Sequence, residues 1–287
     1  MRCKVAVVQF KVRNVSEEDN LRKAEEFISR ASKQGADVIV FPEDFVSRTT
    51  PDIVEFLDSE KNLKVFMKLA KKYKIDVIPG SMIVKNGSRL YNTSYYIDFK
   101  GKVLSEYKKV HLWSTEKKRF KPGDSVSVFD TRYGRVGIII CWDAMFPEIF
   151  RKMMKKKVEI VFCPSYWCYE DAGKGIKYNK KSEEKLIDSL CVDRAFEEEI
   201  VFVFCNASGT NKVSKKRETL VGHSQVTIPF KGIVKKLNHN REGMFVAEID
   251  PEIIKDAEKA YGIKRELKKF TFPRRRTLIK IKQPKNI

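Results

Sequence analysis

Apolar runs alternate with amphipathic stretches along the chain, and this rhythm predicts alternating strands and helices. Residues 38–41 (VIVF) and 136–140 (VGIII) are continuous apolar runs, typical of strands buried on both faces. After Ser16 the apolar positions recur at three- and four-residue spacing as far as Gly35, which predicts a helix with a serine N-cap and a glycine stop. An Asn-Gly pair at residues 86–87 predicts a hairpin turn.

The same patterns place the remaining elements. We expect strands at residues 5–10, 38–41, 75–78, 82–84, 90–98, 103–107, 126–130, 136–140, 158–163, 200–205, 224–228 and 244–249. We expect helices that open near Ser16, Thr50, Leu63, Pro147, Ser182 and Pro251, the last of these closing the fold, and a surface loop over residues 171–181. No linker-like segment interrupts this order. The sequence therefore predicts an α/β protein with one domain, residues 1–263, and a basic arm, residues 264–287.

Length and composition narrow the class of protein. A chain of 287 residues that is 42% apolar and 33% charged can bury a large core, so it is neither disordered nor fibrous. Its longest apolar run, residues 136–142, is far shorter than the ~20 residues of a membrane span. The first ten residues fit a strand better than a signal peptide. We therefore expect a soluble cytoplasmic protein.

The net charge of +20 raises the question of nucleic-acid binding. Residues 264–287 contain ten Lys or Arg and one acid, so this arm supplies +9 of the total. Many other basic residues are mixed with Glu on helical stretches, and no basic strand carries the interleaved aromatics that stack on bases. We favour a thermophile-like surface over a nucleic-acid partner. A nucleic-acid-binding protein is the alternative from another class, and it predicts salt-dependent binding through the arm.

Cysteine and histidine usage gives little support for a metal site. The six cysteines mostly adjoin apolar runs, where cysteine serves as a small buried residue rather than as part of a disulfide framework. Only Cys163 and Cys168 lie close together, and no second pair or nearby histidine completes a zinc site. We expect no metal and no cofactor.

Three reactive side chains follow predicted strands, which is where α/β proteins carry their chemistry. Glu43 comes after VIVFP, Lys109 follows the strand at residues 103–107, and Cys141 ends the run VGIII. Taken singly, a solvated Glu or Lys and an inert buried Cys are the ordinary interpretations.

Together these residues and their surroundings resemble the nitrilase superfamily of carbon–nitrogen hydrolases. The matching pieces, in family order, are FPED around Glu43, YKKVHL around Lys109, EKKRFKPGD with Glu116, and GRVGIIICWDAMFPE around Cys141. The resemblance implies that Cys141 is the nucleophile, Glu43 the base and Lys109 the stabiliser of the thiolate and oxyanion, with Glu116 as a second, positioning glutamate. A thiolate splits amide hydrolysis into acylation and deacylation, and it needs a base and a cation nearby. One departure is Glu198, where many relatives carry Asn.

The resemblance also implies a fold, an assembly and a substrate class. The implied fold is a four-layer α-β-β-α sandwich. The implied assembly is a homodimer or higher homo-oligomer with the arm at the interface. The other interpretation of the arm is a solvated basic tail. Trp-Asp after the nucleophile favours small amides or N-carbamoyl amines, with small nitriles as the alternative. Trp142, Tyr166 and Trp167 are candidate walls of the substrate pocket, or else ordinary core aromatics.

A Cys–His enzyme is the rival interpretation of the same region. It would pair Cys141 with His111 or His223. Because His111 lies only two residues from Lys109, both side chains would have to enter one pocket from an extended segment. We therefore prefer a buried His111 that hydrogen-bonds backbone in its own loop.

Overall fold

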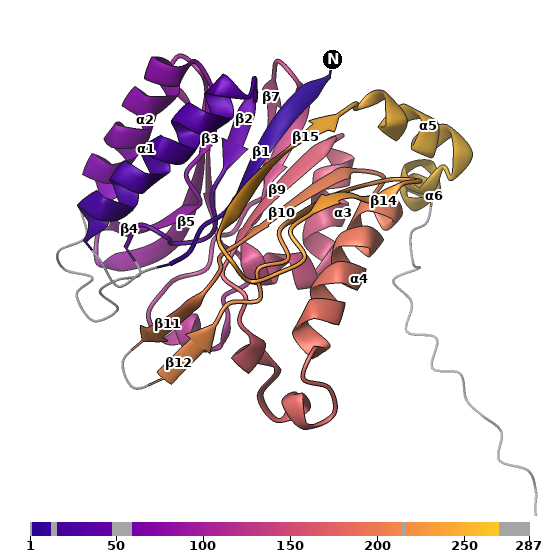
Figure 1. Cartoon of the computed structure of the whole chain (residues 1–287). Coiled ribbons are helices and arrows are strands. Elements are labelled where there is room, and N and C mark those ends of the chain that lie inside the picture. The colour runs from indigo at the N-terminus through magenta and orange to yellow at the C-terminus, as the bar shows by residue number, and fades with distance from the viewer. Residues whose placement is uncertain (1, 13–15, 48–58, 214–215, 270–287) are drawn as a thin grey trace, which may run out of the picture.

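The computed structural model shows two β-sheets packed face to face, with helices on their outer faces (Figure 1). The structure describes residues 2–12, 16–47, 59–213 and 216–269. The strands of the first sheet are β1 Cys3–Gln9, β2 Val38–Val40, β3 Asp76–Ile78, β4 Ser81–Asn86, β5 Arg89–Ile97, β6 Val103–Lys108 and β15 Gly243–Ile249. Their order is β15-β1-β2-β3-β5-β4, and β6 pairs with β5.

The second sheet is built around parallel strands. Its members are β7 Ser127–Thr131, β8 Gly134–Ile138, β9 Ile160–Ser165, β10 Val201–Asn206, β13 Gln225–Ile228 and β14 Gly232–Lys236. Their order is β14-β13-β10-β9-β8-β7, with β8, β9 and β10 parallel. Two further strands, β11 Thr210–Val213 and β12 Lys216–Thr219, form a separate antiparallel pair.

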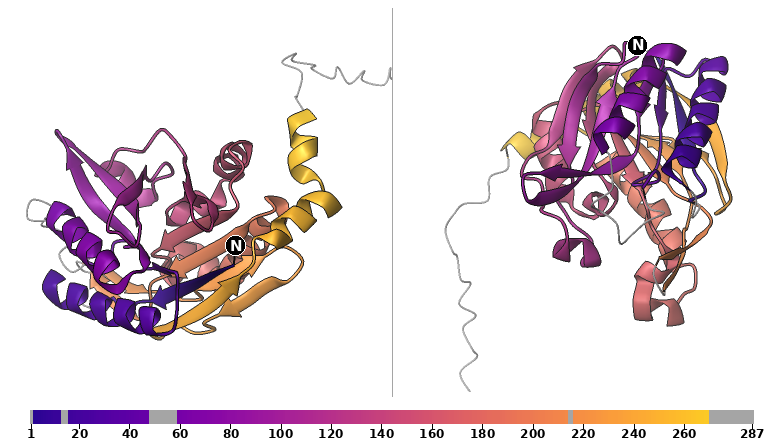
Figure 2. Two further views of the ribbon diagram at one scale, coloured as in Figure 1. Left: turned by 90° about the horizontal axis from the view of Figure 1, so that it is seen from above. Right: turned by 90° about the vertical axis from the view of Figure 1, so that its left-hand side faces the viewer.

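Helices cover both outer faces of this double sheet. The helices are α1 Glu17–Lys33, α2 Ser59–Tyr73, α3 Pro147–Lys155, α4 Ser182–Glu197, α5 Glu252–Ala260 and α6 Ile263–Lys269. The apolar sides of α1 and α2 pack on the first sheet, whereas α3 and α4 pack on the second. Figure 2 shows α5 and α6 on the side of the molecule away from α1 and α2. The four-layer α-β-β-α sandwich that the resemblance implied is thus confirmed.

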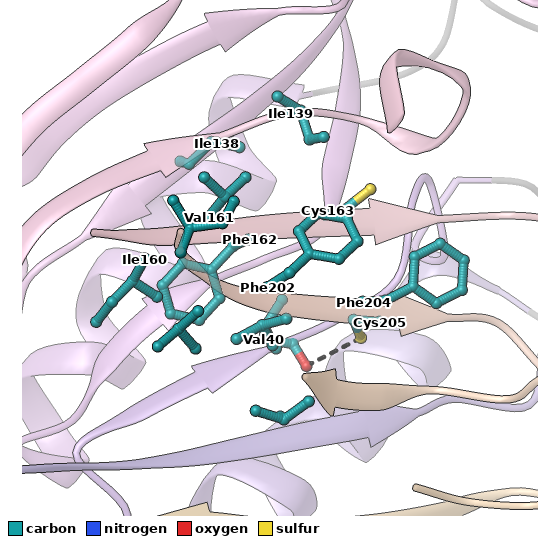
Figure 3. Close-up of a cluster of buried hydrophobic side chains, with 14 of the residues drawn as sticks. Val40, Ile138, Ile139, Ile160, Val161, Phe162, Cys163, Phe202, Phe204 and Cys205 are labelled. Atoms are coloured by element: carbon teal, nitrogen blue, oxygen red, sulfur yellow. Dashed lines mark hydrogen bonds between the residues drawn. The ribbon is translucent and has the colours of Figure 1, made fainter. Parts of the chain in front are cut away.

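The pleat of the strands explains how one sheet serves two apolar layers. In β1, Val5 and Val7 point into the core between the sheets, whereas Ala6 and Val8 contact the layer beneath α1 and α2. Successive side chains of a strand face opposite sides, so a strand between two apolar layers must be apolar throughout. Figure 3 shows this inter-sheet core, in which the Cys205 Sγ donates a hydrogen bond to the Val40 carbonyl oxygen at 3.4 Å.

Several predictions of local structure are confirmed. Ser16 caps α1, since its hydroxyl accepts a hydrogen bond from the Asp19 amide at 3.1 Å. The hairpin between β4 and β5 is confirmed, but its two turn residues are Gly87, at a φ of 60°, and Ser88, one position beyond the predicted Asn86-Gly87 pair. Helix α4 begins at Ser182, as expected. The helix expected near Thr50 lies outside the described residues.

Other predictions were wrong. The segment expected as a loop at residues 171–181 overlaps the 3₁₀ helix η4 Tyr169–Lys177, which is kinked at Gly173. The Asp171 carboxylate stabilises this turn by accepting a hydrogen bond from the Cys168 amide at 2.8 Å. The strands β11, β12 and β14 were missed because they are short and largely polar. The helix opening at Pro251 is not the last, because α6 follows it.

The basic arm begins as a helix rather than as an extended tail. Residues 264–269 belong to α6, and the Lys264 Nζ donates a hydrogen bond to the Glu199 carbonyl oxygen at 3.0 Å. Residues 270–287 lie outside the described part of the chain, so the packing of the arm against another copy stays a prediction. None of the described helices has the length and apolar character that a membrane crossing needs.

Glu198, the departure from the family pattern, is a buried carboxylate just beyond α4. Among the described residues, neither of its carboxylate oxygens has a hydrogen-bond partner, and the Arg151 Nε lies 3.5 Å from Oε1. Burial raises the pKa of Glu198 to about 7, although Arg151 works in the opposite direction. Between the ordinary pKa of 4.5 and pH 7, Glu198 in the folded protein therefore holds a proton that it has lost in the unfolded chain.

Glu198 should consequently make the wild-type protein less stable as the pH rises. Its stabilising contribution is fully present below the unfolded pKa and is lost as the pH rises through about 7. Glu198→Gln keeps the shape of the side chain but cannot ionise. We therefore expect the free energy of unfolding of Glu198→Gln, minus that of the wild type, to rise by about 1–3 kcal/mol from pH 5 to pH 8. Urea unfolding at both pH values measures this difference. Asp193→Asn, on the exposed face of α4, is the control. An equal pH dependence in all three proteins would contradict the prediction.

Candidate active site

The three reactive residues singled out in the sequence meet at one end of the sandwich. Glu43 follows β2, Lys109 follows β6, and Cys141 follows β8 and opens the 3₁₀ turn η3 Cys141–Met145. Although they are far apart in the sequence, all three line a single cavity of about 50 Å³. Its described lining residues are Glu43, Lys109, Trp113, Thr115, Glu116, Cys141, Trp142, Tyr166, Trp167 and Asp171.

Lys109 is the centre of a buried ionic network. Its Nζ lies 2.8 Å from the Glu43 Oε1 and 2.8 Å from the Glu116 Oε2, and the side chain is only 1% exposed. The Asn92 Nδ2 donates hydrogen bonds to the same two glutamates, at 2.7 Å to Glu43 and 3.0 Å to Glu116. Burial alone would lower the pKa of Lys109, but Glu43, Cys141 and Glu116 together raise it. Lys109 is therefore a fixed cation.

Cys141 combines a strained backbone with a protonated resting thiol. Its φ of 47° lies in the left-handed region, which is uncommon for a residue with a Cβ atom and is found at functional sites. Burial, followed by the nearby Glu43 carboxylate, raises the pKa of the thiol well above its usual range. Lys109 and a backbone hydrogen bond from Tyr166 act in the opposite direction. The thiol thus needs a base at the moment of attack, and Glu43 is placed beside it.

The turn that carries Cys141 is held from two sides. The Asp143 carboxylate is fully buried and accepts hydrogen bonds from the Ile140 amide at 3.0 Å, the His111 amide at 2.7 Å and the Tyr107 hydroxyl at 2.7 Å. From α4, the Arg194 Nε donates to the Ala144 carbonyl oxygen at 3.0 Å. These contacts fix the position of the nucleophile on a turn that would otherwise be free to relax.

The structure does not support a Cys–His pair, because His111 and His223 contact carboxylates instead of Cys141. The His111 ring stacks on Phe146, with centroids 3.8 Å apart, and its Nδ1 lies 2.9 Å from the Asp143 Oδ1. The His223 Nδ1 instead lies 3.3 Å from the Asp188 Oδ1. Neither histidine lines the cavity that contains Cys141. The expectation of a buried His111 that hydrogen-bonds backbone in its own loop was also wrong, because the side chain is partly exposed and its ring pairs with the Asp143 carboxylate.

Tryptophans form the apolar wall of the cavity. The chain has three of them, and all three meet here. The ring centroids of Trp113 and Trp142 are 4.3 Å apart, and those of Trp142 and Trp167 are 5.7 Å apart. The Trp167 Nε1 donates a hydrogen bond to the buried Glu183 at 2.6 Å, which fixes that ring. The predicted wall residues Trp142, Tyr166 and Trp167 therefore all line the cavity.

Sequence reasoning gave five residues no place in this site. Trp113, Thr115 and Asp171 line the cavity, and Asn92 and Asp143 hold its reactive residues through hydrogen bonds. One signal was available for Asn92, because it begins a run of three polar residues, residues 92–94, inside a predicted strand. The structure shows all three to be buried. Such a run is unusual in a buried strand and indicates that its side chains have polar partners.

Comparisons with known proteins find relatives of this chain in sequence and in structure. The family described as carbon-nitrogen hydrolase matches residues 4–259. N-carbamoylputrescine amidase of Oryza sativa subsp. japonica is 31% identical over 279 residues, which cover 91% of this chain and 90% of that protein. The crystal structure of Saccharomyces cerevisiae Nit3, a member of branch 10 of the nitrilase superfamily, has a TM-score of 0.76 at 26% identity, covering 90% of this chain and 94% of that chain. A carbon-nitrogen hydrolase from Helicobacter pylori G27 shares the fold, with a TM-score of 0.84 at 22% identity over 92% and 94% of the two chains.

Proposed function

Because the chain belongs to the carbon–nitrogen hydrolases of the nitrilase superfamily, we propose that it hydrolyses small amides or N-carbamoyl amines through a thioester on Cys141. One observation carries this proposal. A thiol, a carboxylate and a fixed ammonium group line the same cavity, on Cys141, Glu43 and Lys109. These are the three groups that attack on an amide carbonyl requires.

The first half-reaction forms the thioester and releases ammonia. The Cys141 Sγ attacks the carbonyl carbon while Glu43 takes the thiol proton. The Lys109 ammonium group and the backbone amide that follows the nucleophile stabilise the negative charge on the carbonyl oxygen. As the C–N bond breaks, Glu43 returns the proton to the leaving nitrogen, and ammonia departs. An N-carbamoyl amine reacts in the same way at its ureido carbonyl.

The second half-reaction regenerates the thiol. Water attacks the thioester carbonyl while Glu43 again takes a proton, and the C–S bond breaks. The proton then returns to the Cys141 sulfur, and the product is a carboxylic acid. From an N-carbamoyl substrate the product is a carbamic acid, which decomposes to carbon dioxide and an amine. Glu116 keeps Lys109 in position through its 2.8 Å ion pair.

An ammonia-release screen over small amides, N-carbamoyl amines and nitriles tests this proposal. We expect ammonia from members of the first two classes, since the site supplies both a base for the thiol and a cation for the oxyanion. The name of the rice relative, an N-carbamoylputrescine amidase, supports inclusion of the second class. Ammonia from nitriles alone would favour the nitrilase alternative. No ammonia from any of the three classes would contradict the proposal.

A further inference from the structure

One amide side chain connects the two glutamates of the active site. We propose that Asn92 is a positioning residue for the general base, and that its amide group keeps Glu43 deprotonated and oriented to take the proton of the nucleophile. The proposal rests on the proposed function, because Asn92 would act through Glu43 in the same reaction.

Asn92 contacts each charged residue of the buried network. Its Nδ2 donates hydrogen bonds to the Glu43 Oε1 at 2.7 Å and to the Glu116 Oε1 at 3.0 Å. Its backbone carbonyl oxygen accepts a hydrogen bond from the Lys109 amide at 2.9 Å. One residue thus connects the base, the second glutamate and the cation, through its side chain and its main chain together.

The pleat of β5 directs Asn92 into this network. Tyr96, four positions further along, faces the core between the sheets, whereas Tyr95 and Ile97 face the layer beneath α1 and α2. Because successive side chains of a strand alternate, Asn92 lies on the inter-sheet face and Thr93 on the other face. Asn92 is only 2% exposed, so bulk water has little access to its amide group.

A neutral amide is a suitable neighbour for a catalytic carboxylate. A hydrogen bond to a carboxylate favours its charged form, and only the charged form of Glu43 can take the proton of the Cys141 thiol. The Glu43 Oε1 accepts a hydrogen bond from the Lys109 Nζ at 2.8 Å, and the Asn92 Nδ2 reaches the same oxygen. The amide adds this second donor without adding a charge, so Lys109 still serves as the cation that stabilises the oxyanion.

The oxygen of the same amide shows which of its two ends is useful. The Asn92 Oδ1 is buried and has no hydrogen-bond partner among the described residues. An unpaired buried acceptor costs stability, and an apolar residue of similar shape, such as leucine, would avoid that cost. The contribution of asparagine at this position therefore comes from its nitrogen, which reaches both Glu43 and Glu116.

Alkylation of Cys141 by iodoacetamide tests the proposal without any substrate. In this reaction the S–C bond forms, iodide leaves, and the thiol proton passes to Glu43, so the acid limb of the rate against pH follows the protonation of Glu43. Asn92→Leu keeps a similar volume and removes the amide donor. Without that donor the carboxylate takes up its proton at a higher pH, and we expect the acid limb to move upward by at least about one pH unit. Mass spectrometry of the peptide that contains Cys141 measures the rate.

Thr93→Val is the matched control in the same strand. Thr93 is fully buried on the opposite face of β5, and its Oγ1 has no hydrogen-bond partner among the described residues. Removal of this hydroxyl group should leave the acid limb at the wild-type pH. If Asn92→Leu does not fold, Asn92→Ala takes its place with the same expected shift, because the smaller side chain cannot clash.

The outcomes separate this proposal from the proposed function. An acid limb at the wild-type pH in the Asn92 variant, at whatever rate, would overturn the proposal, because Asn92 would then serve packing alone. Failure of both Asn92 variants to fold, while Thr93→Val folds, would assign Asn92 a structural role and would likewise overturn the proposal. Absence of ammonia from every substrate class would instead refute the proposed function, and the alkylation profiles would still show whether Asn92 acts on Glu43.

Discussion

Lys109→Met is expected to remove nearly all activity and to destabilise the protein by about 3–5 kcal/mol, the usual cost of deleting one partner of a buried ion pair. Methionine has a similar length and no charge, so the substitution leaves Glu43 and Glu116 without their common cation, 2.8 Å from each. The lost stabilisation of the oxyanion should lower kcat by at least on the order of 10²–10³-fold. Urea unfolding measures the first effect, and ammonia release measures the second.

The neighbouring lysine provides a matched control. Lys108 precedes Lys109 directly, but its side chain is 32% exposed and pairs with Glu106 at 3.4 Å. Exposed pairs of this kind contribute about 0.2–1 kcal/mol, so Lys108→Met should retain most stability and activity. A Lys109→Met protein as stable as Lys108→Met would show that the buried network does not depend on this cation.

The elements that the sequence predicted well are those with local signals. The Ser16 cap, the hairpin between β4 and β5 and the apolar runs of β2 and β8 each depend on residues close together in the chain. The 3₁₀ helix η4 depends in part on a distant contact, the hydrogen bond from the Thr219 amide to the Glu170 Oε2 at 2.7 Å. Such contacts across the chain have no periodic pattern to reveal them.

The site was predictable only in part for the same reason. Glu43, Lys109 and Cys141 lie in motifs that match a family in order, so they could be named from the sequence. Asn92 and Asp143 could not, because their roles depend on β5 and η3 bringing them to partners 24 to 49 residues away in the chain. The Asp171 position in the cavity likewise follows from the folding of η4 and from no motif.

Cys141→Ala should abolish turnover, whereas other buried cysteines should be dispensable. Without the thiol no thioester forms, and loss of the nucleophile in acyl-transfer enzymes lowers kcat by on the order of 10⁴–10⁶-fold. Cys163 is the matched control. It is buried in the adjacent strand β9, and its Sγ lies 3.9 Å from the Cys141 carbonyl oxygen. Cys163→Ala should therefore keep most of the activity, although it removes the same group from the same region.

The most direct test of the account is ammonia release by these two variants and the wild type, on one confirmed substrate and at equal concentrations of folded enzyme. The account predicts ammonia from the wild type and from Cys163→Ala, and none above background from Cys141→Ala. Ammonia release by Cys141→Ala at a rate near that of the wild type would contradict it, because the reaction would then proceed without the thioester on Cys141.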